Sequence, residues 1–160
     1  MASTEIDLAS AHLNMGGTYF EVVGFLYFTY NSNNNSNIYN GKVEVTTIST
    51  PSNSVTVKAR SSIIANTTEN GVTSDSNFDG SWSTNVYSSY NQYATTYSPA
   101  VLISKNNCTI NYVRGVSEVY NDNNLSQSTS VVTYAPSYYL QDISEQLLLL
   151  SVDFLPGIDF

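Results

Sequence analysis

The clearest metal-binding pattern in this chain is Asp75-x-Asn77-x-Asp79-Gly80. Oxygen-bearing side chains at alternate positions, followed by a glycine that permits a sharp turn, match the start of a calcium-binding loop. An EF-hand loop ends on a bidentate Glu, and this chain has Val86 at that position. Two interpretations therefore remain open. One is a calcium site formed by Asp75, Asn77 and Asp79, and the other is an Asx-rich turn whose side chains bond their own backbone.

An aromatic segment without charged residues follows the acidic pattern. Its rings are interleaved with Ser, Thr, Asn and Gln, and they belong to Trp82, Tyr87, Tyr90, Tyr93 and Tyr97. Amphipathic rings set among amide groups are suited to stacking on a sugar or packing against a protein partner. The segment is either such a ligand-binding platform or a set of tyrosines half-buried beneath a long loop.

Residue types for acid–base or nucleophilic catalysis are scarce. The chain has one His, His12, and one Cys, Cys108, and it has no G-x-S-x-G motif. Catalysis needs titratable groups with tuned pKa values, so we predict no enzyme and no catalytic residues. The one carboxylate pairing left open would draw on Asp75, Asp79, Glu118 and Asp122.

The composition is polar but poor in charge. Ser, Thr and Asn supply 59 of the 160 residues, charged residues are 11%, and the formal net charge is −8. Because the five basic residues are scattered, we predict no nucleic-acid partner, and the composition argues against binding to anionic membrane surfaces. The 13 Tyr and 6 Phe, together with many Val and Ile, indicate a folded chain rather than a disordered one.

No segment resembles a Sec signal peptide or a transmembrane helix. The N-terminal residues lack a basic region followed by an apolar one, and no apolar run reaches the roughly 18 residues of a membrane span. The surface composition is nevertheless typical of extracellular proteins. We therefore expect synthesis in the cytoplasm, followed by assembly into a particle or release from the cell.

Alternation of apolar and polar residues dominates the chain and predicts β-strands. The clearest strand is Thr18–Tyr30, which carries large apolar residues on both sides. Phe20, Val22, Leu26 and Phe28 share one side, and Tyr19, Val23, Phe25 and Tyr27 share the other. Both sides of this strand are therefore expected to be covered.

Turn residues predict how the other strands connect. A polar loop is expected at residues 31–40, ending in a tight turn at Asn40-Gly41. Lys42–Thr50 and Ser54–Ala65 are predicted to form a hairpin. A second hairpin is predicted from Pro99–Ser104 and Cys108–Tyr120, and Ser128–Tyr134 is a further strand.

These elements predict one all-β domain over residues 1–160. The expected architecture is an antiparallel β-sandwich or jelly roll of about seven to nine short strands with little helix. Residues 1–17 are expected to be an N-terminal arm, and residues 66–98 a long polar, Tyr-rich segment. The apolar run in residues 140–154 fits either a helix or a strand.

Three functions are consistent with these features. The first is a non-enzymatic structural or assembly protein, such as a subunit of a filament, a phage or virus-like particle, an injection apparatus or an inclusion. It follows from strands that lack the charges by which monomeric sheets avoid edge pairing, and its partners would be itself or other protein subunits. The alternative is a carbohydrate-binding, lectin-like module assisted by calcium. A toxin subunit, whose alternating Ser/Thr-rich strands insert into a membrane, is the third.

Overall fold

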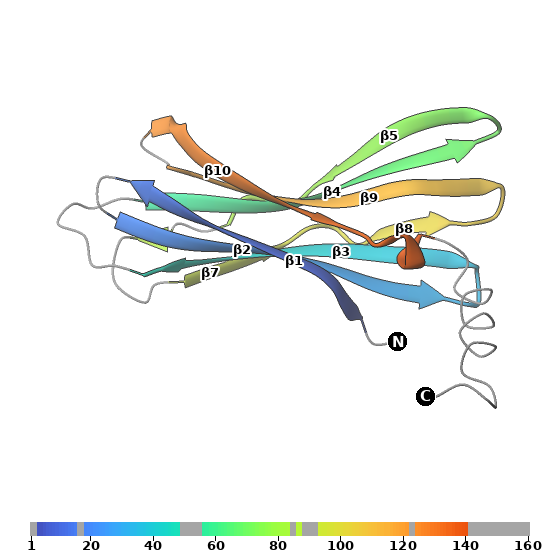
Figure 1. Cartoon of the computed structure of the whole chain (residues 1–160), viewed down its shortest axis with the longest axis horizontal. Helices are drawn as coiled ribbons and strands as arrows, with labels where there is room; N and C mark the ends of the chain where they lie inside the picture. The colour runs from blue at the N-terminus through green and yellow to red at the C-terminus, as the bar shows by residue number, and fades with distance from the viewer. Residues whose placement is uncertain are drawn as a thin grey trace, which may run out of the picture.

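The computed structural model describes residues 3–15, 18–48, 56–83, 86–87, 93–121 and 124–140. These residues form two antiparallel sheets packed as a β-sandwich (Figure 1). In chain order the elements are β1 (Thr4–Met15), β2 (Thr18–Asn31), β3 (Ser36–Thr47), β4 (Thr56–Glu69), β5 (Val72–Asp79), β6 (Val86–Tyr87), β7 (Tyr93–Tyr97), β8 (Val101–Ser104), β9 (Cys108–Asn121), β10 (Asn124–Tyr134) and the 3₁₀ helix η1 (Ser137–Tyr139). The predicted all-β sandwich with little helix is confirmed, although the longest strands have 14 residues and are not short.

The two sheets share one plan. Sheet A has the order β1-β2-β3, and both β7 and β8 pair with the free side of β3. Sheet B has the order β10-β9-β4, and both β5 and β6 pair with the free side of β4. Each sheet therefore ends in an edge that is split into two short strands. Within the described ranges, no helix is long and apolar enough to cross a membrane.

Neither predicted hairpin is present. Of the strand predicted at Lys42–Thr50, residues 42–47 lie in β3 of sheet A, and of the one predicted at Ser54–Ala65, residues 56–65 lie in β4 of sheet B; residues 49–55 are outside the described ranges. In the same way, β8 belongs to sheet A and β9 to sheet B. Turn residues carry no information about which sheet the next strand joins. Each pair instead packs its apolar sides across the core.

Strands also replace the segments predicted as loops. The expected N-terminal arm is β1, and residues 66–98 contain the end of β4 together with β5, β6 and β7. The turn after β2 occupies residues 32–35, and β3 runs straight through Asn40-Gly41. Gly41 is needed there because a Cβ would lie 2.5 Å from Ser61 Oγ of the opposite sheet.

Small residues form a waist at the centre of the sandwich, made of Gly24 and Gly41 in sheet A and Ser61 and Ser117 in sheet B. A Cβ on Gly24 would lie 2.6 Å from Ser117 Oγ, so the sheets approach closely there. Figure 1 shows the two layers converging in the middle and spreading toward both ends.

The waist divides the hydrophobic core into two clusters. The first contains Leu13, Phe20, Val22, Val43, Val45, Val57, Ala59, Ala94, Val119 and Val131. The second contains Leu26, Phe28, Tyr39, Ile63, Ala65, Val101, Ile110 and Val113. Both sheets contribute strands to each cluster.

Hydrogen bonds bridge the two breaks in the edge strands. Gly80 N–H donates to Ser61 O at 3.0 Å, and Ser98 N–H donates to Gly41 O at 2.9 Å. A Cβ on Gly80 would collide with the carbonyl oxygen of Ser61 and crowd that of Tyr97. Each edge is therefore interrupted, after Asp79 in sheet B and after Tyr97 in sheet A, and offers no continuous ladder to another strand.

The opposite edges, β1 and β10, are held together through the C-terminal part of the described chain. Tyr134 N–H donates to Asp7 Oδ2 at 2.7 Å, which joins β10 to β1. The buried Tyr39 hydroxyl donates to Tyr139 O at 2.6 Å and fixes η1 against sheet A. Burial raises the pKa of Tyr39 above its ordinary value, so this donor stays protonated. The helix or strand expected beyond residue 140 lies outside the described residues.

Candidate functional site

The solvent-facing side of sheet A is unusually apolar for the outside of a sandwich. Alternate residues of its strands point outward, and we call the apolar ones the apolar face: Leu8, Tyr19, Val23, Phe25, Tyr27, Ile38, Ile48, Tyr93, Tyr97 and Leu102. Nine of the described large hydrophobic side chains are exposed, and six of them belong to this face. Antiparallel sheets normally present polar side chains to water, so this side is a candidate contact surface.

A lysine lies among the rings at the centre of the apolar face. In register across the sheet, Leu8, Phe25, Lys42 and Tyr97 form one row. Lys42 Nζ is 4.2 Å from the Phe25 ring centroid and 5.4 Å from that of Tyr27, which is cation–π geometry. The two rings are stacked, with centroids 6.1 Å apart. The lysine side chain is consequently only 17% exposed.

Lys42 keeps its charge in this setting. Its ammonium is 3.0 Å from Glu44 Oε1. A hydrogen bond with Tyr27 raises the pKa of Lys42 above its ordinary value, with help from Glu44, and burial opposes this effect only in part. The centre of the apolar face therefore carries one positive and one negative charge, side by side.

The apolar pattern of β2 explains this face. Its inner residues are buried, as expected for a strand in a sandwich. Its outer residues are only partly covered by neighbouring strands, and Tyr19 is exposed. The prediction that both sides of Thr18–Tyr30 are covered thus holds for the inner side alone within one copy of the chain.

The outer side of sheet B has a different chemistry, in which arginines lie on aromatic rings. Near one end of β9, Arg60 Cζ is 4.5 Å from the Trp82 ring centroid, and Arg60 Nη2 donates to Glu118 Oε1 at 3.0 Å. Trp82 also meets Tyr120 edge-on, with ring centroids 4.7 Å apart. Arg60 of β4, Trp82 after β5, and Glu118 and Tyr120 of β9 thus form one packed cluster.

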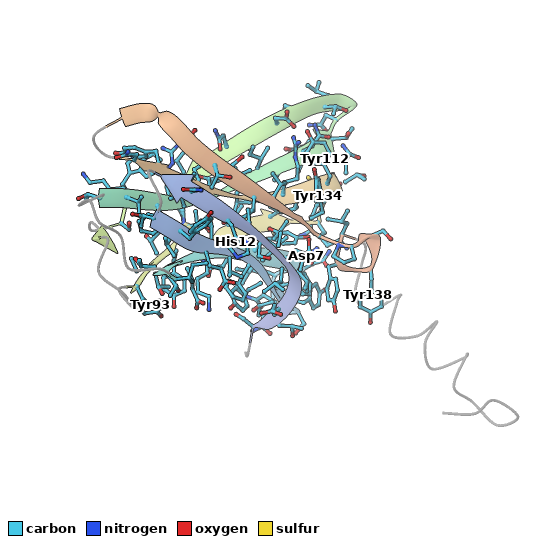
Figure 2. The ribbon with its side chains drawn as sticks, turned by 60° about the vertical axis from the view of Figure 1, so that its left-hand side comes forward. Asp7, His12, Tyr93, Tyr112, Tyr134 and Tyr138 are labelled. Carbon is cyan, nitrogen blue, oxygen red and sulfur yellow. The ribbon has the colours of Figure 1, made fainter. Side chains whose placement is uncertain are left out.

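A second arginine cluster lies toward the other end of β9. Arg114 Cζ is 4.7 Å from the Tyr112 ring centroid, and Tyr112 OH donates to Asp75 Oδ1 at 2.7 Å. Asn66 Nδ2 donates to the same oxygen at 2.8 Å. These hydrogen bonds, that of Asn66 first, lower the pKa of Asp75, and the bond to Asp75 raises the pKa of Tyr112. Figure 2 shows Tyr112 and Tyr134 close together, with Tyr93 at the opposite lower end of the view.

The five aromatic residues predicted as one platform are not on one surface. Trp82 contacts the outer side of sheet B, whereas Tyr93 and Tyr97 are exposed on sheet A. Tyr87 belongs to β6, and its side chain and the whole of Tyr90 lie outside the described residues. The sequence spacing could not reveal the separation, because the chain changes sheets between β6 and β7.

The predicted calcium motif is a strand and not a loop or turn. Asp75, Asn77 and Asp79 are alternate residues of β5, about 6.8 Å apart along the strand, whereas calcium ligands converge at about 2.3–2.6 Å. Asp79 lies 3.9 Å from Arg60, and Asp75 already binds Asn66 and Tyr112. The described part of the chain holds no group of three or more His, Cys, Asp or Glu arranged for a metal ion. Calcium binding itself stays a prediction.

The remaining chemistry-bearing residues are dispersed. His12 Nε2 is 3.8 Å from Glu21 on the neighbouring strand, and both side chains are exposed. Cys108 is half-buried at the start of β9 and lines a cavity of about 230 Å³ beside Glu69 and Phe78. Of the carboxylates considered for glycoside hydrolysis, Asp79 and Glu118 both lie beside Arg60, Asp75 belongs to the other arginine cluster, and Asp122 lies outside the described residues.

Sequence reasoning missed the residues that define both outer faces. Lys42 and Arg60 read as scattered charges, since their aromatic partners, Phe25 and Trp82, lie elsewhere in the sequence. Arg114 was not linked to Tyr112, although Tyr112 is two residues before it on the same strand. The available signals were this spacing and the doubly apolar pattern of Thr18–Tyr30. No protein-family model and no curated protein sequence matches this chain.

Proposed function

We propose that this chain is a non-enzymatic assembly protein that pairs with a second copy of itself through the apolar face. The observation that carries the proposal is the concentration of exposed large hydrophobic residues on one side of one sheet. Water-exposed apolar patches of this kind are typical of protein interaction sites. The doubly apolar β2 would then be covered on its outer side by the partner copy.

The apolar face is large enough for a stable contact. Four strand positions, each about 4.8 Å wide and about ten residues long, give a projected area of roughly 600 Å². The accessible surface of a pleated face with side chains exceeds its projection. This places the face near the roughly 800 Å² per partner of a standard protein interface. Two such faces would stack as sheets do in a sandwich, about 10 Å apart.

The charges at the centre of the face are self-complementary. In a two-fold symmetric pair the same patch contacts itself, so an axis passing between Lys42 and Glu44 brings each ammonium toward the other copy's carboxylate. Aromatic and aliphatic side chains surround these charges on all four strand positions. A second copy of the chain carries the same charge pair surrounded by apolar side chains, whereas an unrelated partner would have to present a matching arrangement by coincidence.

Face pairing also replaces the edge pairing expected from the sequence. The edges β5/β6 and β7/β8 are each interrupted between two strands, and Asp7 joins the β1 and β10 edges. Neither arrangement favours the addition of a further strand. The apolar face on the outer side of sheet A is therefore the more favourable surface for assembly.

The test introduces a charge into the face. Leu8→Lys places an ammonium in the central row, where pairing would bury it without a partner, so we expect self-association to weaken at least about tenfold. Val72→Lys is the matched control, because Val72 is an equally aliphatic, exposed residue at the β4–β5 turn and outside the apolar face. Sedimentation velocity over a concentration series measures both variants against the parent chain.

Two results would overturn the proposal. One is a parent chain that stays monomeric at every concentration tested. The other is a Leu8→Lys variant that associates as strongly as the parent. Circular dichroism and a melting curve verify that both variants are folded.

A further inference from the structure

We propose that the outer side of sheet B binds a neutral oligosaccharide lying along β9, independently of the apolar face on the other sheet. Two shallow depressions on this side are each lined by aromatic rings and one charged residue, Arg114 in the first and Glu118 in the second. A group of opposite charge lies beside each depression, Asp75 next to the first and Arg60 next to the second. Sugar rings present apolar C–H faces and many hydroxyl groups, which is the complement of that chemistry.

The first depression is lined by Tyr112, Arg114 and Tyr134 and has a volume of about 380 Å³. Tyr134 is opposite Arg114 in the β9–β10 register, and its side chain is 56% exposed. A ring this open at the edge of a depression is available for stacking. The Arg114 guanidinium, which lies over the Tyr112 ring, supplies hydrogen-bond donors beside it.

The polar groups of this depression are held in place before any ligand arrives. Arg114 Nη2 donates to Tyr112 OH at 3.2 Å, and Tyr112 OH donates to Asp75. Asn66 bonds Asp75 on one side and accepts from Asn111 Nδ2 at 2.8 Å on the other. A network that spans three strands fixes its donors and acceptors, which lowers the entropy lost on binding.

The second depression has a volume of about 390 Å³, and its lining includes Trp82, Glu118, Tyr120 and Ser128. Trp82 remains partly exposed although Arg60 lies on its ring. The Glu118 carboxylate accepts from Arg60 and is directed to this side of the sheet, where it can accept from a sugar hydroxyl as well.

The spacing of the two depressions indicates a ligand of several rings. Arg114 and Tyr120 both point outward from β9 and are six residues apart, which is about 20 Å along a strand. A single sugar would fill one depression only. A chain of sugars lying along β9 would contact both.

The charges on this side of sheet B favour an uncharged ligand. Each arginine is already accompanied by a carboxylate, Asp75 near Arg114 and Glu118 on Arg60. The chain as a whole carries a formal charge of −8. Sialylated, uronic or sulfated sugars would therefore be repelled, whereas hydroxyl groups can bond to both arginine and carboxylate.

The experiment titrates the full chain with gluco-, galacto-, manno- and xylo-oligosaccharides of about two to eight units, and with sialylated and sulfated sugars, by calorimetry. We expect at least one neutral series to bind, with affinity rising with length. Tyr134→Ala and Trp82→Ala should each weaken binding about tenfold, since each removes one stacking ring. Tyr134→Phe keeps the ring and should stay within about threefold of the parent, and Val72→Ala, away from both depressions, should bind as the parent does.

Several results would overturn the inference. These are no binding by any neutral series, binding of the acidic sugars alone, equal affinity for two and eight units, and binding that survives both Tyr134→Ala and Trp82→Ala. Leu8→Lys separates this inference from the assembly proposal. It disrupts the apolar face on the other sheet and should leave oligosaccharide affinity unchanged.

Discussion

Gly24 is a position where the fold has no room for a side chain. A Cβ there would lie 2.6 Å from Ser117 Oγ and 2.9 Å from Val131 Cγ2 of the opposite sheet. We expect Gly24→Ala to lower the free energy of unfolding by about 1–3 kcal/mol, because the sheets must separate or shift to admit the methyl group. Urea denaturation monitored by circular dichroism measures the change.

A double-mutant cycle identifies the clash as the cause. Ser117→Ala removes the oxygen that the new methyl group would meet, so Gly24→Ala should cost less in the Ser117→Ala background than in the parent. An equal cost in both backgrounds would mean that the loss comes from the Val131 contact or the backbone and not from the Ser117 hydroxyl.

The contacts of Asp75 could not be predicted from the residues around it in the sequence. The acidic pattern that contains it predicted either a calcium ligand or a turn residue, and the structure places it within strand β5. Its partners are Asn66 and Tyr112 on neighbouring strands, at 2.8 and 2.7 Å, and the sequence does not show which residues become neighbours across a sheet. The local pattern therefore predicted neither the strand nor these contacts.

The strands show the same division between local and non-local information. Thr18–Tyr30 was predicted almost to the residue as β2, and Ser128–Tyr134 lies within β10, since alternation is a property of the segment itself. The pairing of β3 with β7 and β8, and of β4 with β9, depends on which buried sides fit together across about 10 Å of core. Turn residues cannot specify that choice.

The two central charges of β3 give a test of two-fold pairing at the level of this strand. Lys42→Glu leaves two carboxylates at the centre of the apolar face and should weaken self-association at least about tenfold. The swap Lys42→Glu with Glu44→Lys restores one charge of each sign and should restore association. Analytical ultracentrifugation at a fixed salt concentration compares the variants.

The variant with both charges exchanged can also give a result that contradicts two-fold pairing through Lys42 and Glu44. If Lys42 matters only for packing on Phe25 and Tyr27, the swapped chain will associate as weakly as Lys42→Glu alone. That result would place the axis of the pair away from these charges. It would also require a different arrangement of the two apolar faces.

The molecule as a whole presents two unlike surfaces on opposite sides of one sandwich. Sheet A offers an apolar side with a single lysine among rings, and sheet B offers arginines, carboxylates and partly exposed rings. Contact with a second copy on one side leaves the other side open to solvent. A pair built in this way would display two sheet B surfaces facing in opposite directions, which suits the cross-linking of extended ligands.

The narrow waist of Gly24, Gly41, Ser61 and Ser117 has a consequence for how the protein opens. Little apolar surface connects the two halves of the core, so the cluster around Val45 and the one around Tyr39 are joined mainly by the strand backbones. Native-state amide hydrogen exchange should therefore resolve two cooperative units with different opening free energies, one for each end of the sandwich. If the amides at both ends instead exchange with one common opening free energy across a denaturant series, the sandwich is a single cooperative unit, and neither end opens before global unfolding.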